Sequence, residues 1–167
     1  MYSQAGQDEW VLSQIKHGTY LEIGASHPVN ISNTYLLEKN GWNGTSVDID
    51  NQCEKLWHEL RKNRLIIGNA LTMSFGWLPA RVDYLSLDID PARNTFEMLT
   101  KLPHNQTRFS LITYEHDYYL CNEWAGHDFR QRSRELLIGL GYELVAADVK
   151  YDGKPYEDWW RDKSHSI

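Results

Sequence analysis

Acidic side chains recur where short apolar segments of the chain end. Glu22 lies in the first of these segments, Asp48 ends the second, Asp88 ends a later one, and Glu115 and His116 follow the next. A carboxylate or an imidazole can take the proton of an acceptor hydroxyl, and a carboxylate can accept both hydrogen bonds of a ribose diol. The pattern predicts a site that binds a nucleoside and removes a proton from a second molecule.

The elements that must position these side chains follow from an alternation of apolar and amphipathic stretches. Strands are predicted over 19–24, 45–49, 64–67, 82–88, 109–114 and 142–149, and helices over 7–16, 32–40, 51–62, 90–101 and 129–140. Asp152 and Gly153 are expected to turn the chain into a short, antiparallel last strand near Trp159. The alternation predicts an α/β fold: a mostly parallel sheet, covered on both faces by helices, whose parallel strands all end at one edge.

Composition bounds the kind of protein. The chain has 167 residues, 41% of them hydrophobic and 24% charged, which predicts one packed domain over 1–167, with an N-terminal helix in 1–17 and a short tail over 150–167. Because the formal charge is −6 and no dense Lys/Arg block occurs, neither a nucleic acid nor a membrane is expected as a partner. Cys53 and Cys121 lack metal-ligand spacing and no signal peptide is recognisable, so a cytoplasmic protein with two inert, buried thiols is expected.

The turn after the first strand narrows the choice of cofactor. Gly24 would let a ligand approach the backbone, but the three-glycine dinucleotide fingerprint is absent and Pro28 offers no N–H to a phosphate. These features disfavour a cofactor with a pyrophosphate and favour S-adenosyl-L-methionine. Asp48 lies where an acid binds the ribose; capping the next helix is the alternative, and Asp50 suits it better. The predicted cofactor-binding residues are Glu22, Gly24, Ala25, Ser26, Asp48, Ile49, Asn69, Ala70 and Asp88, with Asn69 and Ala70 beside the adenine.

The predicted catalytic residues are Asp88, Glu115 and His116. As proton acceptors they would activate a hydroxyl or an amine for attack on a methyl group. Alternatively, the two carboxylates and the imidazole would hold a divalent cation that acidifies the acceptor oxygen. Two other interpretations are equally open: His116 would be an ordinary hydrogen-bonding side chain, and Asp90 would cap a helix beside Pro91. Substrate contacts are predicted for His27, Asp90, Arg93 and Tyr119, with the segment 118–127 as part of the acceptor site.

Several segments together resemble the FkbM-like family of S-adenosylmethionine-dependent methyltransferases. They are Ser-Gln-Ala-Gly-Gln-Asp at 3–8, Leu-Glu-Ile-Gly-Ala at 21–25, Ser-Asn-Thr-Tyr at 32–35 with Glu38, Gly-Trp-Asn-Gly at 41–44 leading to Val47 and Asp48, Tyr-Leu-Ser-Leu-Asp-Ile-Asp at 84–90, and Ile-Thr-Tyr-Glu-His at 112–116. The likeness runs from Ser3 to about Trp160. The chain departs from the family at Ser86, where a lysine is common, and at Asp90 and Pro91, which replace an acid–glycine pair. These departures affect the expected catalytic base and substrate class more than the expected cofactor.

The resemblance implies a single-domain, Rossmann-like class I methyltransferase fold that uses S-adenosyl-L-methionine. It also implies O-methylation of a sugar or another small hydroxylated molecule, so the expected acceptor is a small molecule or a glycan. A metal-dependent O-methyltransferase and a catalytically silent module that binds an adenosine ligand are the alternatives. A nicotinamide oxidoreductase is disfavoured because the phosphate-binding turn is missing. Trp159 and Trp160, if exposed, would offer a surface for a homodimer; packing of the tail on the last strand is the other interpretation.

Overall fold

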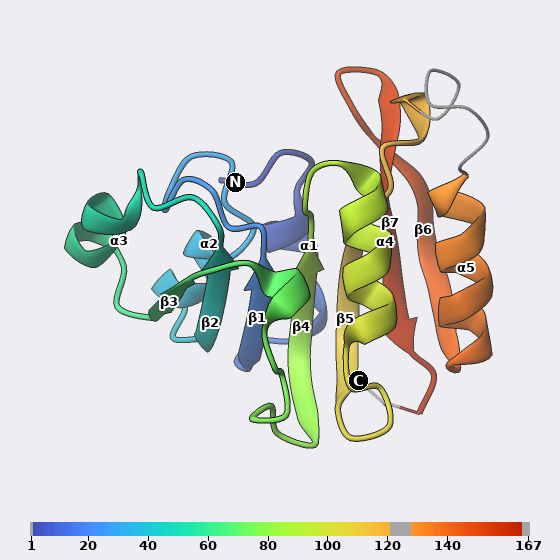
Figure 1. Cartoon of the computed structure of the whole chain (residues 1–167), viewed down its shortest axis with the longest axis horizontal. Helices are drawn as coiled ribbons and strands as arrows, with labels where there is room; N and C mark the ends of the chain where they lie inside the picture. The colour runs from blue at the N-terminus through green and yellow to red at the C-terminus, as the bar shows by residue number, and fades with distance from the viewer. Residues whose placement is uncertain (1, 121–127, 165–167) are drawn as a thin grey trace.

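The computed structural model describes residues 2–120 and 128–164, and the strands in this part of the chain form one seven-stranded sheet (Figure 1). The strands are β1 (Thr19–Ile23), β2 (Asn43–Asp48), β3 (Arg64–Ile67), β4 (Arg81–Leu87), β5 (Arg108–Glu115), β6 (Tyr142–Tyr151) and β7 (Lys154–Asp162). Their order is β3-β2-β1-β4-β5-β7-β6. The first five strands pair in parallel, and β7 pairs antiparallel with both β5 and β6. The predicted mostly parallel sheet with an antiparallel C-terminal strand is confirmed.

Helices cover both faces of the sheet. They are α1 (Gln7–Gln14), α2 (Tyr35–Lys39), α3 (Glu54–Leu60), α4 (Ala92–Lys101) and α5 (Phe129–Gly139), with short 3₁₀ turns η1 (Ala70–Thr72) and η2 (Tyr118–Leu120). In Figure 1, α4 and α5 lie in front of the sheet and α1 and α2 behind it. Side chains alternate across each strand, so Leu21 joins the core under α4 while its neighbour Tyr20 joins the smaller core under α1. In the described ranges, we find no helix with the length and apolar character needed to cross a bilayer.

The end of the chain differs most from the expectation. The segment interpreted as a short tail contains β7, a nine-residue strand between β5 and β6. Asp158 and Asp162, which give the segment its polar character, are buried because Arg134 and Arg108 pair with them. The predicted turn at Asp152 lies in the left-handed region, with φ 49°.

The tryptophans of β7 are not an exposed pair. Trp160 is fully buried in the core, and Trp159 is half-buried with its ring stacked on that of Trp10, at 4.7 Å between ring centroids. The interpretation of these residues as a dimer surface is therefore wrong for Trp160, and the packing of the tail accounts for both. A homodimer stays a prediction without this support.

Candidate functional site

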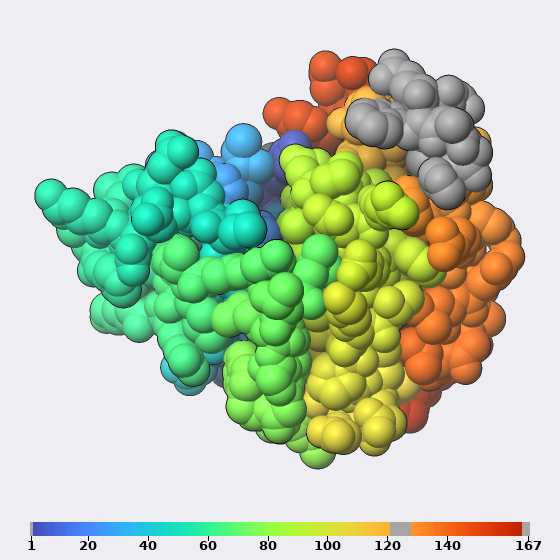
Figure 2. All heavy atoms as spheres, viewed as in Figure 1, coloured from blue at the N-terminus to red at the C-terminus, as the bar shows by residue number. Residues whose placement is uncertain are grey.

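A cleft of about 380 Å³ opens at the carboxyl edge of the sheet, where β1 lies between β2 and β4. Strand order reverses here, because the chain runs outward from β1 through β2 to β3 and then crosses to β4 on the other side. Such a switch point is where open α/β sheets bind their ligands. Figure 2 shows the surface notched between the cyan residues around α3 and the yellow-green start of α4.

Most of the predicted cofactor-binding residues line this cleft. Those in its wall are Gly24, Ser26, Asp48, Ile49, Asn69, Ala70 and Asp88. Glu22 and Ala25 do not line it, because both are buried behind the first turn. The wall also contains residues that were not predicted as cofactor-binding or substrate residues: Ile23, Val47, Asp50, Cys53, Gly68, Leu71, Ile89 and Asn94. Cys53 is half-exposed there rather than an inert buried thiol, and Cys121 lies outside the described residues.

The fold itself requires a glycine at position 24, whether or not a ligand is bound. Its φ is +88°, and a Cβ at this position would lie 1.5 Å from the backbone oxygen of Asp88. We predicted from the sequence that a ligand approaches the backbone of Gly24 closely. In the structure, the backbone of Asp88 at the end of β4 makes this close approach. The glycine lets β1 and β4 end side by side under the cleft, which places Asp88 in its wall.

Gly24→Ala is expected to lower the free energy of unfolding by more than ~3 kcal/mol, because the methyl group must displace backbone atoms. Gly41→Ala is the matched control: its φ is +85°, but nothing lies within 4 Å of an added Cβ. That variant should lose only about 1–2 kcal/mol, the cost of the left-handed backbone. Urea unfolding of both variants measures the difference, and equal losses would contradict the close contact.

Asp48 is fixed at the end of β2 by two backbone hydrogen bonds. Its Oδ2 accepts from the N–H of Ser26 at 2.6 Å and its Oδ1 from the N–H of Asp50 at 2.8 Å. Each carboxylate oxygen keeps a second lone pair, so the half-buried side chain can still accept from a ribose diol. Asp50 binds the N–H of Gln52 and forms a turn, since α3 begins only at Glu54.

Glu22 holds the fold beneath the cleft. Strand register sets it beside Ser46 on β2 and Ser86 on β4. Its Oε2 accepts from the hydroxyls of Ser46, at 2.6 Å, and Thr34, at 2.8 Å. Burial raises the pKa of Glu22. The structure thus assigns Glu22 a structural position rather than a place in the cleft wall.

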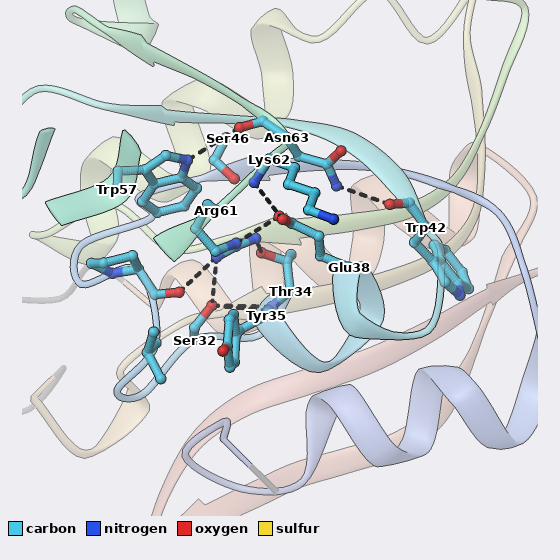
Figure 3. Close-up of polar contacts among 12 residues, drawn as sticks. Ser32, Thr34, Tyr35, Glu38, Trp42, Ser46, Trp57, Arg61, Lys62 and Asn63 are labelled. Carbon is cyan, nitrogen blue, oxygen red and sulfur yellow. Dashed lines mark hydrogen bonds and ion pairs between the residues drawn. The ribbon is translucent and has the colours of Figure 1, made fainter. Parts of the chain in front are cut away.

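Arg61, which the sequence did not single out, fixes the loop that borders the cleft (Figure 3). Its Nε donates to Glu38 at 2.7 Å, and its Nη atoms donate to the carbonyl of Pro28 at 2.8 Å and to Thr34 at 2.9 Å. The guanidinium also stacks on Trp57, 4.3 Å from the ring centroid. Its partners lie far away in sequence, so no local pattern marks it, although Thr34 and Glu38 belong to a segment that carries the resemblance.

Asp88, in the far wall of the cleft, forms a carboxyl pair with Glu115. The two side chains share a hydrogen bond, and Glu115 also bonds to Asp117. Burial raises the pKa of Asp88 to about 6, and the neighbouring acid Asp90 contributes further. Burial followed by the charge of Asp88 raises the pKa of Glu115 far more. Both pKa values are raised and the larger rise is at Glu115, so at neutral pH the pair shares one proton, which favours Glu115, and one negative charge.

His116 does not join this pair. It is fully buried, its Nδ1 accepts from the N–H of Tyr118 at 3.1 Å, and its Nε2 lies 3.5 Å from Asp158 and 3.8 Å from Asp148. The predicted grouping of Asp88, Glu115 and His116 around a metal is not formed. Within the described ranges, the side chains close enough to share an ion are those of His116, Asp148 and Asp158. Both of these carboxylates already bind arginines, Arg134 at Asp158 and Arg130 at Asp148.

The predicted substrate residues separate into different places. Asp90 lines the cleft and its side chain makes no cap bond to α4. His27 and Arg93 line neither this cleft nor the second cavity described next. The Nδ1 of His27 accepts from the N–H groups of Val29 and Asn30, so the side chain shapes its own loop.

A second cavity of about 200 Å³ lies on the other side of the carboxyl pair. Its wall consists of Gln4, Glu115, Tyr119, Tyr151, Asp152, Lys154 and Tyr156. Of the predicted substrate residues, Tyr119 lies here. The part of the predicted acceptor segment over 121–127, including His127, lies outside the described residues.

Comparison with known proteins supports the fold alone. No family model and no curated protein matches the chain, so the FkbM-like resemblance is not confirmed. A TehB-like SAM-dependent methyltransferase from Corynebacterium glutamicum superposes with a TM-score of 0.59 at 15% identity, over 95% of this chain and 88% of that one. A Burkholderia thailandensis 1,6-didemethyltoxoflavin-N1-methyltransferase, solved with bound S-adenosylhomocysteine, gives 0.57 at 14% identity, over 95% and 77%. The chain therefore has the Rossmann-like fold of class I SAM-dependent methyltransferases.

One expectation about partners is corrected by the same comparison. An rRNA methylase from Streptococcus thermophilus superposes with a TM-score of 0.58 at 10% identity, over 93% of each chain. Further similar structures are also described as RNA methylases or methyltransferases. The exclusion of nucleic acid, which rested on the negative net charge and the lack of a basic block, is therefore wrong, because structures similar to this chain include RNA methylases.

Proposed function

We propose that this protein is an S-adenosylmethionine-dependent methyltransferase that methylates a hydroxyl group of a small molecule. The observation that carries the proposal is the cleft at the strand-order switch, with Asp48 on one wall and Asp88, hydrogen-bonded to Glu115, on the other. Methyl transfer from a nucleoside cofactor requires an acidic side chain that binds the ribose and, on the facing wall, a group that accepts the proton of the methyl acceptor. The O-methyl specificity rests on the resemblance described above.

The cofactor would lie along the cleft from β2 to β4. Asp48 would accept hydrogen bonds from the ribose, and Ile49, Asn69 and Ala70 would flank the adenine. Ile49 is 68% exposed at the cleft, which is unusual for an isoleucine and fits an apolar contact with a bound ring. Gly24 and Ser26 would lie beside the ribose and the amino acid end, while Glu22 and Ala25 would support them from behind.

The chain's own chemical contribution is the removal of a proton. When bound, S-adenosylmethionine supplies a methyl group on a positively charged sulfur. Asp88, the ionised member of the pair, would take the proton of the acceptor hydroxyl. Glu115 would keep its own proton and use it to hydrogen-bond Asp88, which holds that carboxylate in position.

Binding of S-adenosylhomocysteine tests the proposal directly. We expect saturating S-adenosylhomocysteine to raise the melting temperature and NAD to leave it unchanged, because a ligand stabilises only the state that binds it. Asp48→Asn should weaken S-adenosylhomocysteine binding about 10- to 100-fold, the value of a charged hydrogen bond. Asp128→Asn is the control, since Asp128 caps α5 and asparagine caps equally well. A protein that S-adenosylhomocysteine does not stabilise would contradict the proposal.

RNA is a second acceptor class, favoured by the RNA methylases among the similar structures. Transfer of labelled methyl groups separates the two classes. The protein is incubated with labelled S-adenosylmethionine and either total RNA or a small-molecule extract, and the labelled product is isolated. Label in the extract supports the small-molecule acceptor; label in RNA alone would replace it.

A further inference from the structure

The second cavity is built by segments from both ends of the chain. Gln4 comes from the N-terminal segment, Glu115 and Tyr119 from the end of β5 and the turn after it, and Tyr151 and Tyr156 from the β6–β7 hairpin. The neighbouring Gln7 ties these segments together, donating to the Tyr156 hydroxyl at 2.6 Å and to Glu157 at 3.2 Å. The cavity is therefore a fixed part of the fold rather than a gap between loose segments.

The cavity and the cofactor cleft meet at the carboxyl pair. Glu115 lines the cavity, Asp88 lines the cleft, and the two side chains are hydrogen-bonded. A molecule in the cavity therefore lies beside Glu115, whose hydrogen-bonded partner Asp88 faces the cleft. At about 200 Å³ the cavity is smaller than the roughly 300–1,000 Å³ of sites for drug-sized ligands, so it suits a small molecule.

Negative charge around the cavity exceeds positive charge. Asp152 lies in the wall, and Asp88 and Asp117 each bond to Glu115. Burial, followed by the charge of Asp117, raises the pKa of Tyr119 to about 12, and burial followed by the charge of Glu157 raises the pKa of Tyr156. Among the described residues of the wall, Lys154 is the one cation, and it is exposed. A positive ligand would relieve this repulsion.

Aromatic rings complete the lining. Tyr119, Tyr151 and Tyr156 all contribute to the wall, and the rings of Tyr151 and Tyr156 meet edge to face at 6.2 Å between centroids. The chain already places one ammonium on such a ring, because Nζ of Lys154 lies 5.1 Å from the centroid of Tyr119. Aromatic faces combined with carboxylates are the usual surroundings of a bound ammonium group.

We propose that the second cavity binds the methyl acceptor and that this acceptor is a small hydroxylated molecule carrying a protonated amine. The amine lies among the tyrosines and Asp152, and a hydroxyl of the same molecule faces the Asp88–Glu115 pair. This inference rests on the proposed methyltransferase function, to which it adds the chemical class of the acceptor.

Matched ligand pairs test the inference. The protein is loaded with S-adenosylhomocysteine and titrated calorimetrically, below neutral pH, with D-glucosamine against D-glucose and with ethanolamine against ethylene glycol. Each pair differs by one ammonium group in place of a hydroxyl. We expect at least one amine to bind about tenfold more tightly than its neutral match, in line with one close charge interaction. Asp152→Asn should reduce that preference severalfold, whereas Glu59→Gln, an exposed charge change on α3, should not alter it.

The outcomes separate the two proposals. If S-adenosylhomocysteine binds but neither amine binds more tightly than its neutral match, the assignment of a cationic acceptor is wrong and the methyltransferase proposal stands. An amine preference that Asp152→Asn leaves intact would also overturn the assignment to this cavity. If S-adenosylhomocysteine itself fails to bind, the proposed function is wrong.

Discussion

Replacing Arg61 by methionine is expected to lower the free energy of unfolding by about 3–5 kcal/mol, the usual cost of removing one partner of a buried ion pair. The guanidinium lies at the centre of the contacts drawn in Figure 3. It compensates the half-buried Glu38 through a 2.7 Å ion pair and lowers the pKa that burial raises at Glu22. Methionine fills similar space, but it removes the positive charge beside Glu38 and Glu22. It also removes the hydrogen-bond donor to the Pro28 carbonyl.

Arg64→Met is the matched control for this experiment. Arg64 lies on β3 with an exposed side chain, and its guanidinium carbon lies 6.0 Å from the centroid of the Trp77 ring. Its replacement should change stability by less than about 0.5 kcal/mol. Urea unfolding gives both values. Because Arg61 fixes the loop beside the cleft, the folded Arg61→Met protein should also bind S-adenosylhomocysteine more weakly. If Arg61→Met were as stable as Arg64→Met, the contacts of Arg61 would not hold the loop.

The architecture could be predicted because its signals are local. Most of the parallel strands are short, largely apolar runs. Asp48 ends β2 and Asp88 directly follows β4, so the rule that parallel strands end at one edge placed both acids at the same cleft. The ends of elements were less predictable. For example, α3 is shorter than expected because Asp50 binds the N–H of Gln52 and forms a turn first.

The structure separates some residues that the sequence predicted to act together, and the separation has physical reasons. Glu115 and His116 are consecutive residues at the end of a strand, and consecutive side chains point to opposite faces, so both could not enter one catalytic group. Glu115 faces the second cavity, whereas His116 lies against Asp158. Arg61 and the full length of β7 were missed for another reason: each depends on ion pairs between residues far apart in sequence, which no local pattern reveals.

Asp88→Asn is expected to reduce methyl transfer by about 10²- to 10⁴-fold, the usual contribution of a general base. Because the pKa of Asp88 is raised to about 6, its ionised fraction increases with pH through that value. The wild-type rate should therefore rise with pH below about 6 and level off above it, and the asparagine variant should lose this dependence. The measurement uses labelled S-adenosylmethionine and the small-molecule extract, with S-adenosylhomocysteine binding as the check that the cleft is intact.

Glu115→Gln distinguishes the two members of the pair. Glu115 already holds a proton, since burial and the charge of Asp88 raise its pKa strongly. Glutamine is likewise uncharged and keeps a hydrogen-bond donor for Asp88, so this variant should retain most of the rate and the rise with pH. Equal losses in both variants would mean that the proton acceptor is Glu115 or the pair as a unit. A rate that neither substitution lowers would place proton removal elsewhere, because a base that takes the acceptor proton cannot be replaced by an amide without cost.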